Sequence, residues 1–169
     1  MTGGGQPMNN VWVSSGSTTI EAMINPIAAA CAGDDLNESF IPDTVHFLEN
    51  PGLGDALSEA TTVIETILEQ YGIEDPTIET TRIGHETEFS EIVSHYQSAI
   101  QAAHDAEANV AVDVTPGRKF MSVIAFNAGT TFDADHIFYF YLKSSDYYSR
   151  VYPEIPKPAT ELYDFTEVL

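Results

Sequence analysis

Positive charge is scarce in this sequence. Six Lys and Arg residues stand against 26 Asp and Glu residues, so the formal net charge is −20. A field of that sign repels duplex nucleic acid and anionic lipid at long range, and we expect neither as a partner. The carboxylates are spread along the chain and form no tail. This pattern is typical of a halophilic protein, whose salt-rich cytoplasm screens the repulsion between carboxylates.

Cysteine and long apolar runs are scarce as well. The single cysteine, Cys31, lies in an Ala-rich apolar segment, which excludes a disulfide framework and favours a buried thiol over a nucleophile. No apolar run reaches the length of a membrane span, and no signal peptide is recognisable. We therefore expect a cytoplasmic protein without membrane contact.

Motifs of metal and nucleotide chemistry are missing. The sequence has no GxGxxG fingerprint and no P-loop lysine motif. His85-Glu86 resembles the start of a zinc-protease helix, but Phe89 stands where the second histidine is required. We therefore expect no metal site and no cofactor.

The five histidines are expected to be solvated or structural. His85, His95 and His104 lie at offsets that turn them to different helix faces, which predicts solvated side chains. His46 and His136 lie in predicted strands, where a hydrogen-bonded structural role is common. None of them is assigned to a site.

Alternating apolar segments predict strands separated by helices. Hydrophobic residues make up 43% of the 169 residues, enough for a sizeable core in one domain. The strands are expected at 10–14, 44–48, 77–83, 109–112 and 136–142.

Local signals predict how two of the helices begin, bend and end. Thr18 has capping-box spacing with Glu21 and so predicts the start of the first helix. Pro26 is expected to kink that helix or to mark a second start. Gly129 is expected to end the helix that follows the fourth strand.

The pattern as a whole predicts an α/β fold. The tail from Ser144 to Leu169 carries tyrosines and prolines and suits an antiparallel hairpin at the sheet edge. We therefore expect a Rossmann-like three-layer sandwich, with a mostly parallel sheet and a C-terminal antiparallel hairpin. Residues 1–9 are Gly-rich and expected to be disordered, and residues 10–169 are expected to form a single domain.

The turn after the fourth predicted strand carries the strongest local signal. Thr115 is expected at the N-cap of a helix and Pro116 at its first position, where a missing N–H costs nothing. Gly117 lets a ligand approach the backbone, and the free N–H groups of a helix start attract anions. Asp113 is expected to order the turn as a hydrogen-bond acceptor.

Two of the six cationic residues, Arg118 and Lys119, follow this turn directly. Their position predicts an anion site, with an ordinary surface helix start as the alternative. Adjacent helical residues point about 100° apart, so the sequence leaves open which of the two faces the ligand.

A second polar turn is expected to meet the first. In a sheet of order 3-2-1-4-5, a ligand lies at the carboxyl ends of strands 1 and 4, where the order reverses. The first strand ends in a hydroxyl-rich turn, residues 14–19. The expected ligand contacts are Gly16, Ser17, Thr18, Asp113, Thr115, Pro116, Gly117 and Arg118.

These features resemble the CRISPR-associated Rossmann-fold (CARF) sensor domains. The matching segments are VSSGSTT, DVTPGRKFM, the apolar strand HIFYFYL and the tail YYSRVYPEIP. The resemblance implies a homodimer that binds cyclic oligoadenylate, most often the four-adenosine ring, across its two-fold axis. Pro116 departs from the family pattern, because a small residue is frequent there, and it removes one amide donor.

The resemblance leaves two activities open. Some CARF proteins are ring nucleases, in which a ribose 2′-hydroxyl attacks the adjacent phosphate without metal; Lys119 and Ser14 or Ser15 match the residues that position it. Others only sense or sequester the ring and act on a partner protein. A small-molecule α/β enzyme outside this family is a third reading.

The aromatic tail and the apolar final helix and strand present more apolar surface than one small sheet can cover. This surplus predicts a symmetric homodimer whose two crevices adjoin.

Overall fold

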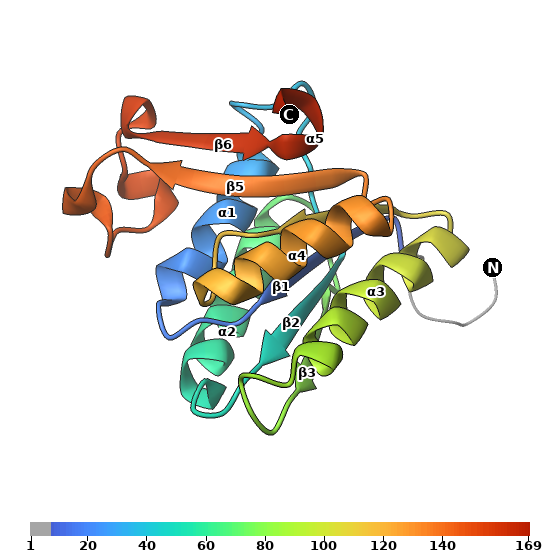
Figure 1. Cartoon of the computed structure of the whole chain (residues 1–169). Coiled ribbons are helices and arrows are strands. Elements are labelled where there is room, and N and C mark those ends of the chain that lie inside the picture. The colour runs from blue at the N-terminus through green and yellow to red at the C-terminus, as the bar shows by residue number, and fades with distance from the viewer. Residues whose placement is uncertain (1–7) are drawn as a thin grey trace.

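A six-stranded sheet forms the middle layer of the molecule (Figure 1). The computed structural model describes residues 8–169 and has the strand order β3-β2-β1-β4-β5-β6. Strands β1 to β5 are parallel, and β6 pairs antiparallel with β5. The strands are β1 (Asn10–Ser15), β2 (Thr44–Glu49), β3 (Thr77–Arg82), β4 (Asn109–Asp113), β5 (His136–Leu142) and β6 (Thr160–Asp164).

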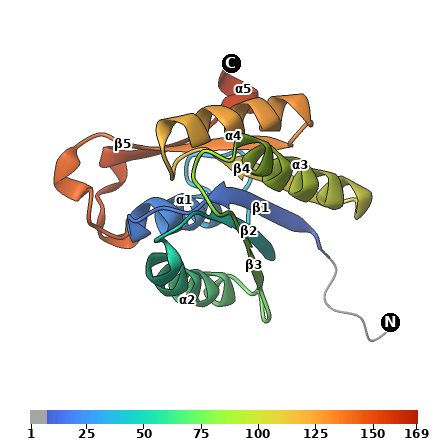
Figure 2. The same cartoon turned by 60° about the horizontal axis from the view of Figure 1, so that its bottom comes forward.

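Helices cover both faces of the sheet (Figure 2). Because parallel crossovers are right-handed, the reversal of strand order between β1 and β4 sends the later helices to the opposite face. One face carries α1 (Ile20–Ala32) and α2 (Gly54–Gln70), and the other carries α3 (Phe89–Asp105) and α4 (Lys119–Thr131). A short α5 (Phe165–Val168) follows β6. The predicted α/β three-layer fold with its C-terminal antiparallel pair is confirmed.

Each face of the sheet has its own apolar core. Trp12 and Phe138 stack at 5.5 Å between ring centroids and belong to the core under α1 and α2. Val11 and Val13 alternate to the other side and pack with α3 and α4. Burial on both faces explains why the central strands are apolar throughout.

Two helix details differ from the sequence prediction. Helix α1 starts after Thr19, one residue later than Thr18 predicts, and Thr19 makes no side-chain cap. The helix continues through Pro26, so this proline does not mark a second start. The packing of nine buried residues outweighs the hydrogen bond that the proline removes. Helix α4 continues past Gly129 to Thr131. A Cβ on this glycine would lie 2.9 Å from the Ile137 side chain. Gly129 is therefore a close-packing position and not a helix end.

The connection between β5 and β6 is longer than a tight hairpin turn. It contains three 3₁₀ turns: η1 (Ser145–Tyr147), η2 (Tyr152–Glu154) and η3 (Lys157–Ala159). Asn25 of α1 anchors it, accepting from the Tyr152 N–H at 2.9 Å and donating to the Arg150 carbonyl at 2.9 Å.

The predicted N-terminal disorder falls mainly on residues 1–7, which lie outside the described residues. Asn9 is already tied to the domain, because its N–H donates to Asp43 and its carbonyl accepts from the Asn109 N–H. Between residues 8 and 169, no helix has both the length and the apolar character needed to cross a bilayer. Cys31 is buried, as predicted, and burial raises the pKa of its thiol to about 12.

Candidate functional site

A crevice opens at the carboxyl edge of the sheet, where the strand order reverses between β1 and β4. Its volume is about 320 Å³. Four loops that follow β1, β2, β3 and β4 build its walls. The lining residues are Gly16, Ser17, Thr18, Asn50, Pro51, Leu53, Glu86, Gly117 and Arg118.

Three helix starts converge on this crevice. Leu53 is the N-cap of α2, Arg118 is the N-cap of α4, and Thr18 directly precedes the N-cap of α1. None of the three N-caps makes a side-chain hydrogen bond to its helix. The first N–H groups of a helix have no intrahelical partner, and the helix dipole adds partial positive charge there. The crevice is therefore suited to an anion.

The turn after β4 differs from the prediction in one respect. The helix starts at Lys119 with Arg118 as N-cap, so Thr115 is not the N-cap and Pro116 is not the first helical residue. The reason is the turn itself: Asp113 accepts from the Thr115 N–H at 2.9 Å, and Gly117 has a φ of +95°. That backbone conformation is outside a right-handed helix and favours glycine.

Close backbone packing shapes both turns. The Gly16 N–H donates to the Leu48 carbonyl at 2.7 Å, and a Cβ on Gly16 would lie 2.8 Å from that oxygen. A Cβ on Gly117 would lie 3.2 Å from the Ser15 Cβ. The two glycines therefore let the turns after β1 and β4 approach the strands behind them.

A buried polar network supports the crevice from behind. Ser14 donates to an Asp113 carboxylate oxygen at 3.4 Å, and the hydroxyls of Ser15 and Tyr96 are 2.6 Å apart. All four residues are buried. Burial raises the pKa of Asp113 to about 7, although bonds from Thr115 and Ser14 oppose the shift. The network holds α3 and the ends of β1 and β4 together.

His95 belongs to this support, and the prediction of a solvated side chain is wrong. It is 5% exposed, and its Nε2–H donates to the Ser14 carbonyl at 3.0 Å. Burial lowers the pKa of His95 to about 4, so the ring is neutral at pH 7. His136 is hydrogen-bonded to Asp164, as predicted for a histidine in a strand, and Nδ1 of His46 lies 3.3 Å from a carboxylate oxygen of Glu79.

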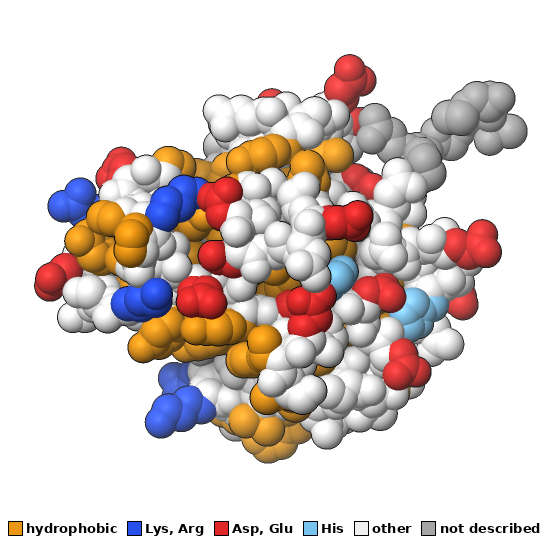
Figure 3. Space-filling model, turned by 90° about the horizontal axis from the view of Figure 1, so that it is seen from above, with side chains coloured by type: hydrophobic (Ala, Val, Ile, Leu, Met, Phe, Trp, Pro, Cys, Tyr) orange, Lys and Arg blue, Asp and Glu red, His pale blue; other side chains and the backbone are white. Residues whose placement is uncertain are grey.

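All six Lys and Arg residues lie at strand ends or in segments attached to the carboxyl edge. Figure 3 shows Lys and Arg side chains gathered at one end of the face, while Asp and Glu are spread over all of it. The Lys and Arg side chains are therefore concentrated at this end of the molecule. The six are Arg82 at the end of β3, Arg118 and Lys119 after β4, and Lys143, Arg150 and Lys157 between β5 and β6.

The structure distinguishes Arg118 from Lys119. Arg118 lines the crevice and lies 3.3 Å from a carboxylate oxygen of Glu86. Lys119 is exposed at the first position of α4 and is not among the lining residues. Of the two cations, Arg118 is the one that can contact an anion in the crevice, where Glu86 also lines the wall.

The predicted site residues divide into two groups. Gly16, Ser17, Thr18, Gly117 and Arg118 line the crevice. The others lie outside its lining, and the roles assigned to them stay predictions: Ser14, Ser15 and Asp113 are buried behind it, Pro116 is buried in the turn, Thr115 bonds to β5, and Lys119 is exposed on α4.

Asn50 is a lining residue that sequence reasoning missed. It follows β2 directly, is 8% exposed, and its side-chain oxygen has no hydrogen-bond donor within residues 8–169. A buried acceptor without a partner costs free energy, so a ligand that supplies a donor there gains affinity. Residues at this strand end contact the ribose in Rossmann folds that bind dinucleotides, which is the signal that could have identified it.

A second hollow of about 370 Å³ lies at the same edge, beside β5. Thr115 links it to the crevice turn, because its hydroxyl oxygen accepts from the Phe140 N–H at 2.9 Å. Tyr139, Tyr141 and Tyr148 line the hollow and are partly exposed. Such rings offer stacking surfaces to planar ligands. Elsewhere, within the described part of the chain, no three His, Cys, Asp or Glu side chains are grouped to hold a metal ion.

The fold, and the crevice at the point where the strand order reverses, place the chain in the class of Rossmann-like α/β domains. No protein-family model and no curated protein matches the sequence. Solved structures do match it: Can2 from Sulfobacillus thermosulfidooxidans in complex with cyclic tetra-adenylate (TM-score 0.53, 18% identity), and protein VC1899 from Vibrio cholerae (0.58, 10%). Csm6 from Enterococcus italicus, bound to cyclic hexa-2′-fluoro-hexa-dAMP, matches with a TM-score of 0.62 and 14% identity.

These matches cover 82%, 77% and 94% of this chain, but only 33%, 30% and 42% of the Can2, VC1899 and Csm6 chains. The chain thus spans less than half the length of each protein. At this level of identity the likeness is one of fold, and it confirms the fold expected from the resemblance to CARF domains.

Proposed function

We propose that this chain is a CARF domain and that its crevice binds a cyclic oligoadenylate, with the four-adenosine ring as the ligand. The observation that carries the proposal is the convergence of three helix starts without side-chain caps on the crevice that Arg118 lines. A ring of phosphodiesters supplies the anionic charge that these groups favour. Two of the solved structures with this fold carry cyclic oligonucleotides of this chemistry.

The same edge of the sheet also offers contacts to the nucleosides of the ring. A backbone phosphate in the crevice leaves the neighbouring base within reach of the hollow lined by Tyr139, Tyr141 and Tyr148. Stacking on an aromatic ring is worth about 1–3 kcal/mol per base. Asn50 then takes a donor from the ligand, either a ribose hydroxyl or the adenine amino group.

The proposal includes a symmetric homodimer. A four-nucleotide ring repeats the same phosphodiester four times, so two crevices related by a two-fold axis, each about 320 Å³ and each lined by one Arg118, match its symmetry. Phe89 and Val123 are exposed near the starts of α3 and α4, and Phe89 packs edge to face with Phe120. This apolar patch lies on the same edge as the crevice, so its pairing with a second copy brings two crevices together. Light scattering in molar KCl is expected to give twice the chain mass; a monomer mass contradicts the dimer.

Ring cleavage is the further activity that the resemblance implies. A ribose 2′-oxygen forms a new bond to the adjacent phosphorus, the 5′-oxygen leaves, and the 2′-hydroxyl proton passes to it. This step requires orientation and charge stabilisation but no metal. Lys119 is the mobile ammonium nearest the β4 turn and is the candidate for that role. In the alternative, the ring is sensed or sequestered and a partner protein responds.

The decisive experiment measures binding and cleavage separately. Calorimetric titration with cyclic tetra-adenylate in 0.3 M and 1 M KCl gives affinity, and product analysis in EDTA gives cleavage. Arg118→Ala is expected to weaken binding about 10- to 100-fold, because a charge-assisted hydrogen bond contributes about 1.5–3 kcal/mol. Arg82→Ala is the matched control, since it removes the same charge from the same edge outside the crevice lining.

Each outcome has a distinct meaning. Equal effects of Arg118→Ala and Arg82→Ala contradict the anion site. Lys119→Ala is expected to slow cleavage about 10²- to 10³-fold with little change in affinity. Tight binding by the wild type without products favours the sensor and makes Lys119 at most a ligand contact.

A further inference from the structure

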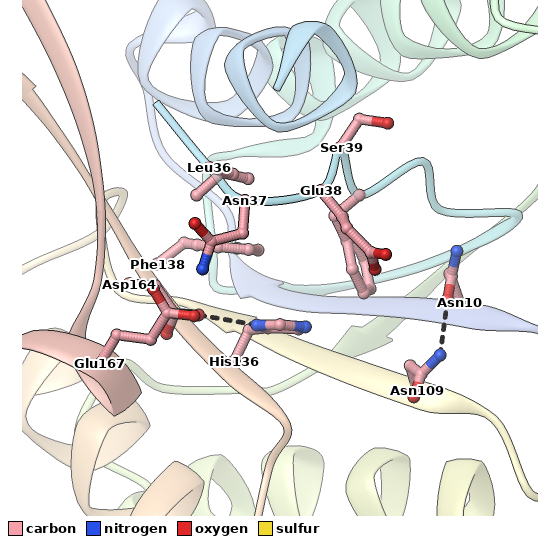
Figure 4. Close-up of a pocket in the computed structure, with 11 residues that line it drawn as sticks. Asn10, Leu36, Asn37, Glu38, Ser39, Asn109, His136, Phe138, Asp164 and Glu167 are labelled. Carbon is pink, nitrogen blue, oxygen red and sulfur yellow. Dashed lines mark hydrogen bonds and ion pairs between the residues drawn. The ribbon is translucent and has the colours of Figure 1, made fainter. Parts of the chain in front are cut away.

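A larger cavity lies at the opposite, amino edge of the sheet (Figure 4). Its volume is about 590 Å³, which is in the range of small-molecule sites. The first residues of β1, β4 and β5 form its floor, and the segment between α1 and β2 covers it. The polar lining residues are Asn10, Asn37, Glu38, Ser39, Asn109, His136, Asp164 and Glu167.

His136 is held in one orientation at the centre of this cavity. Its Nδ1 lies 2.7 Å from a carboxylate oxygen of Asp164, and its ring is parallel to Phe138 at 5.3 Å between centroids. The edge of Phe40 fixes the ring from a third direction. A histidine whose Nδ1 is bound by a carboxylate presents Nε2 for an outside partner. Figure 4 shows this second nitrogen on the side of the ring away from Asp164.

Asp164 is itself fixed by other donors. It accepts from the Ile137 N–H at 3.2 Å and from the Thr166 N–H and hydroxyl at 3.0 and 2.7 Å. Burial acts to raise the pKa of Asp164, but the bonds from His136 and Thr166 lower it overall. Its side chain is 4% exposed while that of His136 is 34% exposed, so the imidazole is the member of the pair that reaches the cavity.

The groups that face the cavity include the exposed carboxylates of Glu38 and Glu167 and several side-chain amides. Figure 4 shows Asn37 and Glu38 extending from the covering segment into the cavity, with Asn10 and Asn109 joined at one end. Among the described residues, no Lys or Arg lines the cavity. Lys157 pairs with Asp34 of the covering segment, but neither of the two belongs to the lining. The charged or titratable lining residues in this part of the chain are the carboxylates Glu38, Asp164 and Glu167 and the imidazole of His136.

We propose that this amino-edge cavity is a second ligand site, which binds a small organic cation with several N–H donors, a primary amine or a guanidinium compound. Glu38 supplies the charge. In the neutral His136 ring, whose Nδ1–H donates to Asp164, Nε2 accepts an N–H of the ligand, and the carboxamide oxygens of Asn37 and Asn109 accept others. A carboxylate pairs with a guanidinium through two parallel hydrogen bonds, which a neutral ligand of the same size lacks. The site is separate from the crevice and does not depend on the function proposed for it.

Calorimetric titration of the protein with agmatine in 0.15 M KCl tests this site. Glu38→Gln is the variant, because Glu38 is exposed and its loss leaves the His136–Asp164 pair intact. Glu59→Gln, an exposed carboxylate on α2, is the control for general attraction to a protein of net charge −20. Glu38→Gln is expected to weaken agmatine binding about tenfold and Glu59→Gln to leave it unchanged.

A second readout locates the ligand. The titration of His136 is followed by NMR. The bond to Asp164 raises the pKa of His136, burial opposes this, and the charges of Asp135 and Glu167 add to the rise, while Glu38 lines the same cavity. A bound cation opposes the imidazolium charge, so agmatine is expected to lower the pKa of His136, whereas 1,4-butanediol leaves it unchanged.

The outcomes separate the possible sources of the cation. Binding of both agmatine and the peptide Gly-Arg-Gly supports a free compound or a side chain equally, and binding of the peptide alone assigns the site to an arginine of a protein partner. Equal losses in Glu38→Gln and Glu59→Gln, an unmoved His136 titration, or no binding by either probe overturns the proposal.

Discussion

Replacing Gly117 by alanine tests the turn on which the crevice depends. Gly117 has a φ of +95°, and a Cβ there would lie 3.2 Å from the Ser15 Cβ and 3.3 Å from the Met121 sulfur. Gly72 offers a matched control, because its φ is also +95° and a Cβ there would meet nothing within 4 Å. The two variants share the cost of the backbone conformation, and only Gly117→Ala adds crowding against β1 and α4.

The magnitude follows from these two contributions. An L side chain in this backbone region costs about 1–3 kcal/mol, and this cost applies to both variants. Crowding adds about 1 kcal/mol at Gly117, at the low end for overpacking because the Met121 side chain can shift. For a domain of this size 1 kcal/mol lowers the Tm by about 2–4 °C. Gly117→Ala is therefore expected to melt about 2–4 °C below Gly72→Ala.

Thermal melts and titration with cyclic tetra-adenylate check both parts of the reasoning. Displacing Gly117 shifts Arg118 and the first N–H groups of α4, so affinity is expected to fall about tenfold in Gly117→Ala. Gly72→Ala is expected to bind as the wild type does. Equal melting temperatures refute the crowding argument. Wild-type affinity in Gly117→Ala refutes the assignment of this turn to the site.

Three further predictions concern a side chain in the crevice, one behind it and the charge of the whole chain. Asn50→Ala is expected to weaken ring binding several-fold without lowering the Tm, because its buried side-chain oxygen has no donor to lose within the described chain; a lower Tm with unchanged affinity contradicts this. The raised pKa of Asp113 contributes stability that is present below pH 3.8 and lost as pH rises to about 7. Asp113→Asn does not titrate, so its Tm relative to wild type should rise from pH 4 to 7; a constant difference opposes the assignment. The Tm is expected to increase between dilute buffer and molar KCl, where counter-ions screen the net charge of −20, and a salt-independent Tm argues against the halophilic interpretation.

Local residue patterns are enough to assign the kinds of element and their order. Apolar runs such as residues 136–142 and the helical period of residues 89–105 depend on local alternation, so they could be assigned without knowledge of distant contacts. Right-handed crossovers then restrict the sheet topology, which is why the turns after β1 and β4 could be predicted to meet. The Thr-Pro-Gly turn and Arg118 are recognisable from their residue types, although the helix begins at Lys119 and not at Pro116.

Contacts between distant segments determine which side chains reach the crevice and which support it. The position of His95 in the helical pattern predicts a solvated side chain. The packing of α3 against β1 instead places its ring against the Ser14 carbonyl. Asn50 enters the site because β1 pairs with β2 and brings the two strand ends together. His136 and Asp164 are 28 residues apart and meet through the antiparallel pairing of β5 with β6. Such contacts join segments far apart in the chain, and their energies depend on burial and register that no local pattern records.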